Sequence, residues 1–221
     1  MNSELIRNDF PILKTKVGGH QIVYFDNAAT TQRPLPVVNA VLDYTTHENG
    51  NPHRGAHIFA ISASEAYDTS KEVVRDFINA RSEKEIIYTR NTSESLNLVA
   101  RSYGETHLKA GDHILITIAE HHSNLVTWQR VAQKTGAILD YIYVDKETGH
   151  FPEEELKKID DPRVKLFAFA EVSNVLGIDF DPKPLIQRAH AHGAIVVLDG
   201  AQSTPHKPVD VQDLDCDFFA F

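Results

Sequence analysis

Residues 194–199 read Ala-Ile-Val-Val-Leu-Asp, and residues 164–170 read Val-Lys-Leu-Phe-Ala-Phe-Ala. Both runs are apolar at consecutive positions rather than at alternate ones. A strand with this pattern is covered on both faces, as in a parallel sheet that lies between layers of helices. The two runs therefore predict the centre of a parallel α/β sheet.

Other short runs rich in β-branched and aromatic residues lie on either side of this pair. In total we predict six strands, over residues 85–89, 113–118, 138–144, 164–170, 194–199 and 217–221. The intervening stretches predict helices, over residues 61–79, 93–103, 125–135, 153–158 and 184–192. Because strands and helices alternate along the chain, the sequence predicts a doubly wound α/β sheet.

Length, charge and cysteine content restrict the class of protein. The 221 residues suffice for one domain, or for one domain and part of another, and their net charge is −9. Such a charge repels nucleic acids and anionic membranes, so neither is an expected partner. Cys216 is the single cysteine, which excludes an internal disulfide. The N-terminus lacks the apolar core of a signal peptide, and no apolar run could span a bilayer, so we expect a cytoplasmic protein.

Polar residues follow several of the predicted strands. Asp199 ends the most hydrophobic strand, at the edge of a parallel sheet where ligands bind. Its carboxylate could keep a cofactor ring nitrogen protonated, or it could cap the turn formed by residues 200–203. Thr92 and Ser93 begin a helix, where free N–H groups could hold a phosphate, although an ordinary helix cap is the alternative.

Two histidine pairs raise the question of a metal site. His121 and His122 follow the strand over residues 113–118, and His53 and His57 are four positions apart. Histidines can bind metals, stack on rings or carry protons. No third ligand stands at a recognisable spacing, so we predict no metal site.

Three further residues have ordinary structural interpretations. Asn174 follows the strand over residues 164–170, where asparagine favours a turn. Cys216 is interpreted as packing beside a strand. Lys207 lies between two prolines and is interpreted as a solvated surface lysine.

Together and in this order, these segments resemble the class-V branch of fold-type-I pyridoxal-phosphate (PLP) enzymes, specifically the group II, SUF-type cysteine desulfurases. The likeness covers nearly the whole chain. It is carried by residues 24–31 (YFDNAATT), 53–57 (HRGAH), 92–100, 120–124 (EHHSN), 172–177 (VSNVLG), 198–203 (LDGAQS) and 209–218. The resemblance implies the three-layer α/β/α large domain of fold-type-I enzymes, with a mainly parallel sheet.

The resemblance also implies roles for individual residues around PLP. Asp199 would pair with the pyridine nitrogen, and Gln202 would hydrogen-bond the phenolic oxygen. His121 would stack on the ring and act as a catalytic proton carrier. Thr92 and Ser93 would hold the phosphate.

Four residues are implied to line the substrate. Asn174 would face both the substrate and the cofactor, while Ala28, Ala29 and His53 would lie on the substrate side. The implied reaction converts L-cysteine, or selenocysteine, to L-alanine and leaves sulfur as a protein persulfide. It implies a homodimer and a sulfur-acceptor protein, within sulfur metabolism and iron–sulfur cluster assembly.

In this family the Schiff-base lysine belongs to a Ser-Gly-His-Lys stretch directly after a strand like residues 217–221. The nucleophilic cysteine and the substrate-binding arginine lie further on. The sequence ends at Phe221, so we expect a truncated chain that is unstable and inactive by itself. We expect residues 1–20 to be an N-terminal segment that packs with a small domain, and residues 21–221 to be a partial PLP-binding domain.

Alternatives to a working desulfurase remain open. The chain could be a pseudoenzyme, half of a split enzyme, or a related PLP lyase or aminotransferase with another amino-acid substrate. Three departures from the family pattern bear on this choice. They are Asn91 where glycine is usual, Thr127 where proline is common, and the run Ile-Asp-Phe-Asp over residues 178–181.

Overall fold

The computed structural model describes residues 3–221, and the chain divides into two compact units, Met1–Val73 and Val74–Phe221. Among the described residues, no helix has both the length and the apolar character required to cross a membrane.

The first unit is mostly helical. Its helices are α1 (Ser3–Asn8), α2 (Leu35–Asp43) and most of α3 (Ile58–Phe77), and a short antiparallel hairpin joins β1 (Lys16–Val17) to β2 (His20–Gln21). The long helix α3 confirms the helix predicted over residues 61–79, while α2 was not predicted. Pro36 lies in the first turn of α2, where the missing N–H of proline has no partner to lose.

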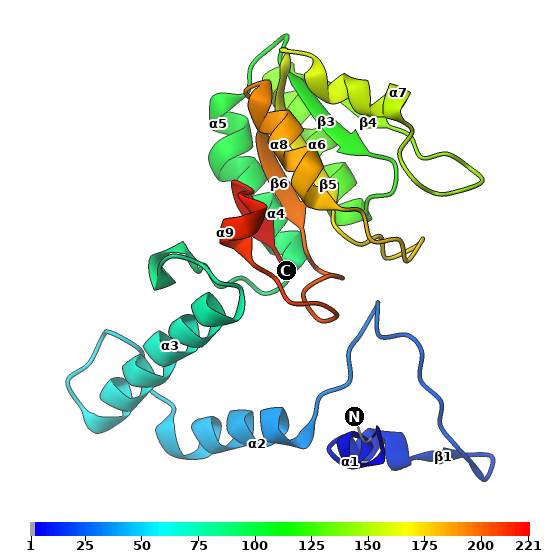
Figure 1. Ribbon diagram of the computed structural model, residues 1–221. Helices are drawn as coiled ribbons and strands as arrows, with labels where there is room; N and C mark the ends of the chain where they lie inside the picture. The colour runs from blue at the N-terminus through cyan, green and yellow to red at the C-terminus, as the bar shows by residue number, and fades with distance from the viewer. Residues whose placement is uncertain (1–2) are drawn as a thin grey trace. The chain divides into compact units, whose positions relative to one another are not determined.

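The second unit contains a five-stranded sheet in the order β4-β3-β5-β6-β7 (Figure 1). All neighbouring strands in it are parallel, as the sequence predicted. The strands are β3 (His113–Thr117), β4 (Ile138–Ile142), β5 (Val164–Ala170), β6 (Ile195–Asp199) and β7 (Phe218–Ala220).

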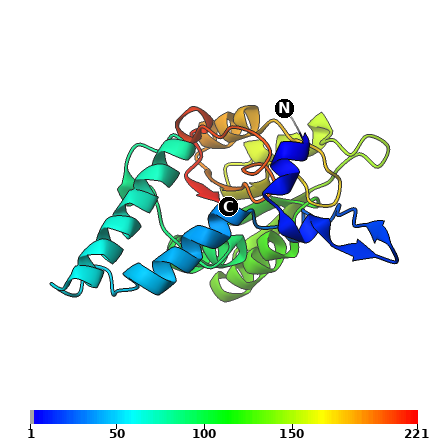
Figure 2. The ribbon, with the colours of Figure 1, turned by 90° about the horizontal axis from the view of Figure 1, so that it is seen from below.

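Helices cover both faces of this sheet (Figures 1 and 2). One face carries α4 (Thr92–Val99), α5 (Glu105–His107) and α6 (His122–Thr135), and the other carries α7 (Glu153–Leu156), α8 (Pro182–Ala191) and α9 (Val211–Leu214). The result is the expected three-layer α/β/α arrangement.

Alternation along the strands sends side chains into two separate cores. In β3, Ile114 packs into the core beneath α4 and α6 together with Trp128, whereas Leu115 packs into the core beneath α8 together with Ile186. All four side chains are fully buried. The central positions of such a strand are therefore apolar on both sides, because both of its faces are covered.

The strand predicted over residues 85–89 is wrong. Glu83–Glu85 forms a 3₁₀ turn, and residues 86–89 are extended but pair with no strand of the described chain. Ile86 is buried beside Ile78 and Val209, while Ile87 is 68% exposed. A groove of about 450 Å³ separates this segment from the outer edge of β7. The residue types favour an extended backbone, but a strand also needs a neighbour to pair with.

Candidate cofactor site

The carboxyl ends of β5, β6 and β7 are aligned at one edge of the sheet. Ala170 pairs with Asp199, and Asp199 pairs with Ala220. The segments that follow β3, β5 and β6 leave the sheet at this edge, where open α/β sheets bind their ligands. Three of the predicted site residues lie in these segments, namely His121, Asn174 and Gln202, and Asp199 ends β6 at the same edge.

Asp199 is buried at the last position of β6, with 4% of its surface exposed. Its Oδ1 accepts a 3.0 Å hydrogen bond from the backbone N–H of Ala201. Burial raises the pKa of Asp199, although the Ala201 bond and the nearby His121 act in the opposite direction. A carboxylate held out of water in this way would be stabilised by a cationic partner, such as a protonated ring nitrogen.

His121 is the N-cap of α6, and its ring is fixed from the helix side. Its Nδ1 accepts the N–H of Ser123 at 3.2 Å and lies 2.8 Å from the Ser123 hydroxyl. Because Nδ1 accepts, the neutral ring carries its proton on Nε2. The ring is exposed and meets His122 edge to face, with the ring centroids 6.0 Å apart.

The carboxyl group of Glu120 lies inside the site, and the sequence interpretation gave it no role. Burial raises its pKa to about 7, against hydrogen bonds from Thr117, Asn124 and Ala170 that lower it. Glu120, Asn124 and Trp128 follow one another at intervals of four residues. That spacing puts the last two on one face of a helix and could have indicated a buried polar chain.

Ser173 anchors the loop that follows β5. Its buried hydroxyl donates to the carbonyl of Ala119 at 3.1 Å and accepts the N–H groups of Val175 and Leu176 at 3.4 and 3.3 Å. Asn174 is exposed between these anchored positions. The turn predicted for Asn174 is therefore confirmed. It belongs to the loop after β5, the strand that pairs with β6.

Gly200 begins the loop that follows β6, and its lack of a side chain is required. A Cβ at this position would lie 2.1 Å from Cζ of Phe219. Its N–H donates to the carbonyl of Ala220 at 2.8 Å, and its carbonyl accepts from Thr204 at 3.0 Å. Gln202 is half-buried within this closely packed turn.

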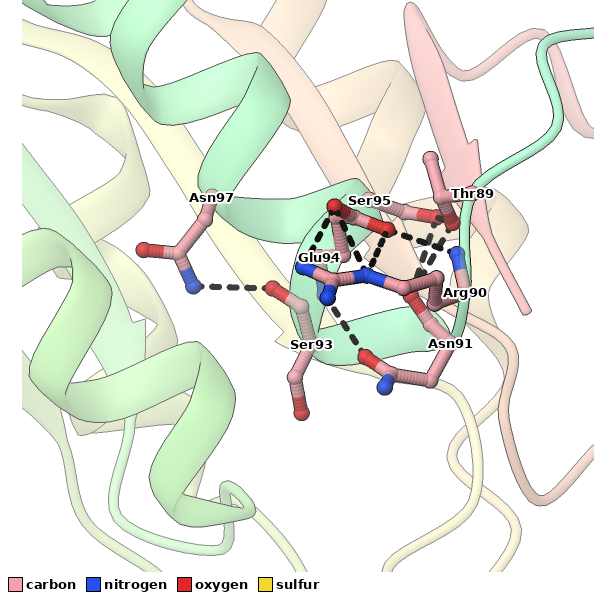
Figure 3. Close-up of polar contacts among 7 residues, drawn as sticks. All are labelled: Thr89, Arg90, Asn91, Ser93, Glu94, Ser95 and Asn97. Atoms are coloured by element: carbon pink, nitrogen blue, oxygen red, sulfur yellow. Dashed lines mark hydrogen bonds and ion pairs between the residues drawn. The ribbon is translucent and has the colours of Figure 1, made fainter.

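The start of α4 is a well-capped helix terminus (Figure 3). The Asn91 side chain accepts the N–H of Glu94 at 2.9 Å. Asn91 has a φ of −173°, an extended conformation that any residue adopts, so asparagine in place of glycine causes no strain here. The Glu94 carboxylate binds the N–H of Arg90 at 2.6 Å and its guanidinium at 3.0 Å.

Thr92 occupies the first position of α4 and is half-buried, while the next residue, Ser93, is exposed. Ser93 lines a recess of about 420 Å³, whose other lining residues are Arg90, Asn91, Glu94, Asn97, Leu98 and Arg101. The first N–H groups of a helix have no partner within the helix, and the positive end of its dipole favours an anion. This terminus therefore offers free backbone N–H groups to an anion.

Lys207 is held in an ion-pair cluster, so its interpretation as a solvated surface residue is wrong. Its Nζ lies 2.7 Å from Oε1 of Glu171 and 2.7 Å from Oδ1 of Asp179. The Glu171 side chain is only 4% exposed. The cluster joins the loops after β5 and β6, an arrangement that distance along the sequence concealed.

Cys216 packs at the edge of the α8-side core, as the sequence predicted. Burial raises the pKa of its thiol to about 12, and the neighbouring Asp217 acts in the same direction. The thiol is therefore protonated at neutral pH and is a poor nucleophile.

The second unit thus brings Asp199 and His121 together and places Asn174 and Gln202 on adjoining loops. Ala28, Ala29 and His53 belong to the first unit. There, the N–H of His53 donates to the Ser64 hydroxyl at 2.8 Å, and its ring lies 3.4 Å from Asp68. Within residues 3–221, no group of three or more His, Cys, Asp or Glu side chains could hold a metal ion.

This set of groups fits PLP. A buried carboxylate matches its ring nitrogen, an exposed imidazole matches its ring face, and a helix N-terminus matches its phosphate. The fit rests on Asp199, His121 and the start of α4.

Comparison with known proteins gives the same family. The Aminotransferase class-V family model matches residues 23–221. A "Probable cysteine desulfurase" of Halalkalibacterium halodurans is 47% identical over 221 residues, which cover 100% of this chain and 54% of that protein. A "Cysteine desulfurase" of Synechococcus elongatus is 48% identical over 98% of this chain and 34% of that protein.

A solved structure shares the fold over nearly the whole chain. The apo structure of cysteine desulfurase from Thermococcus onnurineus NA1 matches with a TM-score of 0.88 and 40% identity, over 98% of this chain and 52% of that one. The chain therefore spans about half the length of this structure, and between a third and a little over half of the two curated relatives. With the fold, the site and the relatives in agreement, the chain belongs to the aminotransferase class-V family of PLP-dependent enzymes, on the branch of the cysteine desulfurases.

Proposed function

We propose that these residues form the cofactor-binding part of a cysteine desulfurase, which removes sulfur from L-cysteine and releases L-alanine. Selenocysteine would be an alternative substrate, from which the enzyme removes selenium. The sulfur passes to a protein persulfide and then to an acceptor protein. The proposed enzyme is a cytoplasmic homodimer that supplies iron–sulfur cluster assembly. The observation that carries the proposal is the buried Asp199 carboxylate at the end of β6, close to the His121 imidazole.

Each of these side chains is proposed to act on a particular group of PLP. Asp199 holds the proton on the pyridine nitrogen, and Gln202 hydrogen-bonds the phenolic oxygen. His121 covers the ring face and moves a proton through Nε2. Thr92 and Ser93 bind the phosphate through the helix terminus.

We assign substrate contacts to Asn174 of the second unit, and also to Ala28, Ala29 and His53 of the first. When bound, the cofactor supplies an electron sink for bonds broken at the substrate's α-carbon. Asp199 strengthens this effect, because its negative charge keeps the ring nitrogen protonated. We assign residues 1–20 to packing against a small domain, and residues 21–221 to the cofactor domain.

PLP titration of the 221-residue chain tests the cofactor site directly. Asp199→Asn removes the charge with little change of shape, so we expect affinity to fall about tenfold or more, the value of a hydrogen bond to a charged group. Glu147→Gln is the matched control, because Glu147 is exposed in a surface turn. Equal PLP affinity of the two variants would contradict the proposed site.

Turnover is a separate question. The proposal assigns the Schiff-base lysine, the nucleophilic cysteine and the substrate-binding arginine to residues outside the 221. The chain alone should therefore release no sulfide or alanine from L-cysteine, and borohydride should not fix PLP to it. Covalent fixation of PLP would show that a lysine within these residues does that task. The same assay on the product of the genomic reading frame, with other L-amino acids as controls, tests the substrate.

A further inference from the structure

Glu120 receives hydrogen bonds from three different elements. Its Oε1 accepts from the hydroxyl of Thr117, the last residue of β3, and from the N–H of Ala170, the last residue of β5, at 3.1 Å. Its Oε2 accepts from Nδ2 of Asn124, in the first turn of α6, at 2.6 Å. One carboxyl group therefore joins two strand ends to one helix start.

The donors themselves are held in orientation. Oδ1 of Asn124 accepts the indole N–H of Trp128 at 2.8 Å, which turns Nδ2 of Asn124 toward Glu120. Asn124 and Trp128 are both fully buried. The Thr117 hydroxyl accepts the N–H of Ala119 at 3.2 Å, so its own hydrogen points to Glu120. Buried groups that satisfy one another in this way hold a single arrangement.

This chain of bonds ends at the residue next to His121. The Glu120 backbone leads directly into the His121 N-cap. Asp199 is close enough to raise the pKa of Glu120, and His121 is close enough to lower the pKa of Asp199. A shift of the Glu120 side chain would release the first turn of α6 from the sheet. The Ser123 N–H that holds the His121 ring belongs to that turn.

We propose that Glu120 is a positioning residue, whose carboxyl group fixes the His121 imidazole beside Asp199 by tying the start of α6 to the ends of β3 and β5. The part that concerns the cofactor rests on the proposed function, since His121 and Asp199 are its assigned contacts. Glutamine at this position would keep the acceptor for Thr117 and Ala170. Its amide nitrogen, however, would face Nδ2 of Asn124, donor against donor.

The test uses ligand-free chain first. Side-chain ¹⁵N NMR reports which nitrogen of His121 carries the proton, in wild type, Glu120→Gln and Glu120→Ala. Wild type should show a fixed proton on Nε2, and both variants should show a mixture of tautomers. If Glu120→Ala does not fold, Glu120→Gln keeps the test intact, because it retains two of the three contacts.

The control is Ala189→Gly on α8, buried against the opposite face of the sheet. It weakens the same unit without touching α6. An unchanged His121 spectrum in Glu120→Gln, or the same change in Ala189→Gly, would overturn the proposal, because the effect would then be absent or merely a loss of stability.

PLP affinity is then measured on the same proteins. We expect Glu120→Gln to bind about tenfold more weakly than wild type, with Ala189→Gly close to wild type. Equal affinity of wild type and Glu120→Gln would overturn the link to the cofactor. Failure of wild type to bind PLP at all would instead contradict the proposed function, while the ligand-free spectra would still decide the role of Glu120.

Discussion

The backbone N–H of Ala170 donates a 3.1 Å hydrogen bond to Oε1 of Glu120, across fifty positions of sequence. The last N–H of β5 thus finds its acceptor in the side chain of Glu120, which lies in the loop after the neighbouring strand β3. The bond also places a carboxyl group where burial favours the neutral form and three donors favour the charged one. The pH dependence of stability follows from this balance.

The burial of Glu120 should make the folded chain less stable as pH rises. Its pKa is raised from 4.5 to about 7 in the folded state, so between these values the folded chain holds a proton that the unfolded chain has lost. The resulting loss of unfolding free energy is absent below pH 4.5, grows as pH rises to 7, and reaches at most about 3 kcal/mol. Glu120→Gln cannot ionise at this position, so it should not lose this free energy. Measured in urea across pH 4–8, the unfolding free energy of the variant minus that of wild type should therefore increase by this amount as pH rises. A constant difference would contradict it.

Removal of the Asn124 side chain should be costly. Asn124→Ala leaves the Trp128 indole N–H and one oxygen of Glu120 without their partners in a buried site. We expect a loss of about 2–4 kcal/mol in unfolding free energy. Trp128 is the single tryptophan, so its fluorescence reports both the local change and the unfolding transition. Gln133→Ala, at an exposed position of α6, is the control and should cost little.

A methyl group at Gly200 should collide with Phe219. Since the added Cβ would lie 2.1 Å from the ring carbon Cζ, Gly200→Ala should destabilise the chain by about 1–3 kcal/mol. The double variant Gly200→Ala with Phe219→Leu shortens the ring side chain and should cost less than the sum of the two single changes. Simple additivity in this cycle, measured by chemical denaturation, would show that the collision is not the cause.

Lys207 should stabilise the loops on either side of the site. Burial acts to lower its pKa, but hydrogen bonds to Asp179 and Glu171 outweigh this and raise it. Lys207→Met leaves the buried Glu171 carboxylate without its ionic partner, at a cost of about 3 kcal/mol. Lys146→Met, at an exposed site, should be neutral, and Glu171→Gln added to Lys207→Met should recover part of the loss. No recovery would mean that the charge of Glu171 is not what Lys207 offsets.

The Cys216 thiol should react slowly in the folded chain. With its pKa raised from 9.0 to about 12, the thiolate fraction at pH 8 falls about a thousandfold, and the rate with a disulfide reagent should fall with it. Labelling in denaturant supplies the reference rate for the unfolded thiol. A folded rate close to that reference would contradict the buried, protonated thiol.

Much of the second unit could be predicted from local pattern. Residues 164–170 and 194–199 became the central strands β5 and β6, because runs that are apolar on both faces are stable only between two layers of helices. Asp199 and His121 could likewise be proposed from the sequence, since Asp199 ends a predicted strand and His121 follows one. The family motifs then placed PLP at that edge.

The failures share one cause. The run over residues 85–89 has strand-forming residues, but pairing depends on a neighbour that no local pattern specifies. The two prolines that flank Lys207 predict a surface turn and therefore a solvated lysine. Its partners Glu171 and Asp179, however, come from the loop after another strand. The functional side chain missed in the site, Glu120, owes its character to the Ala170 N–H fifty positions away.

The sequence by itself therefore determined most elements of the second unit, their order, the parallel sheet and the family, because these depend on periodicity and on short motifs. Only the tertiary structure decided the protonation balance of Glu120, the orientation of His121, the need for glycine at position 200 and the pairing of Lys207. The physical reason is that burial and hydrogen-bond partners are set by residues distant in sequence, and the free energy of a polar group depends mainly on those two quantities.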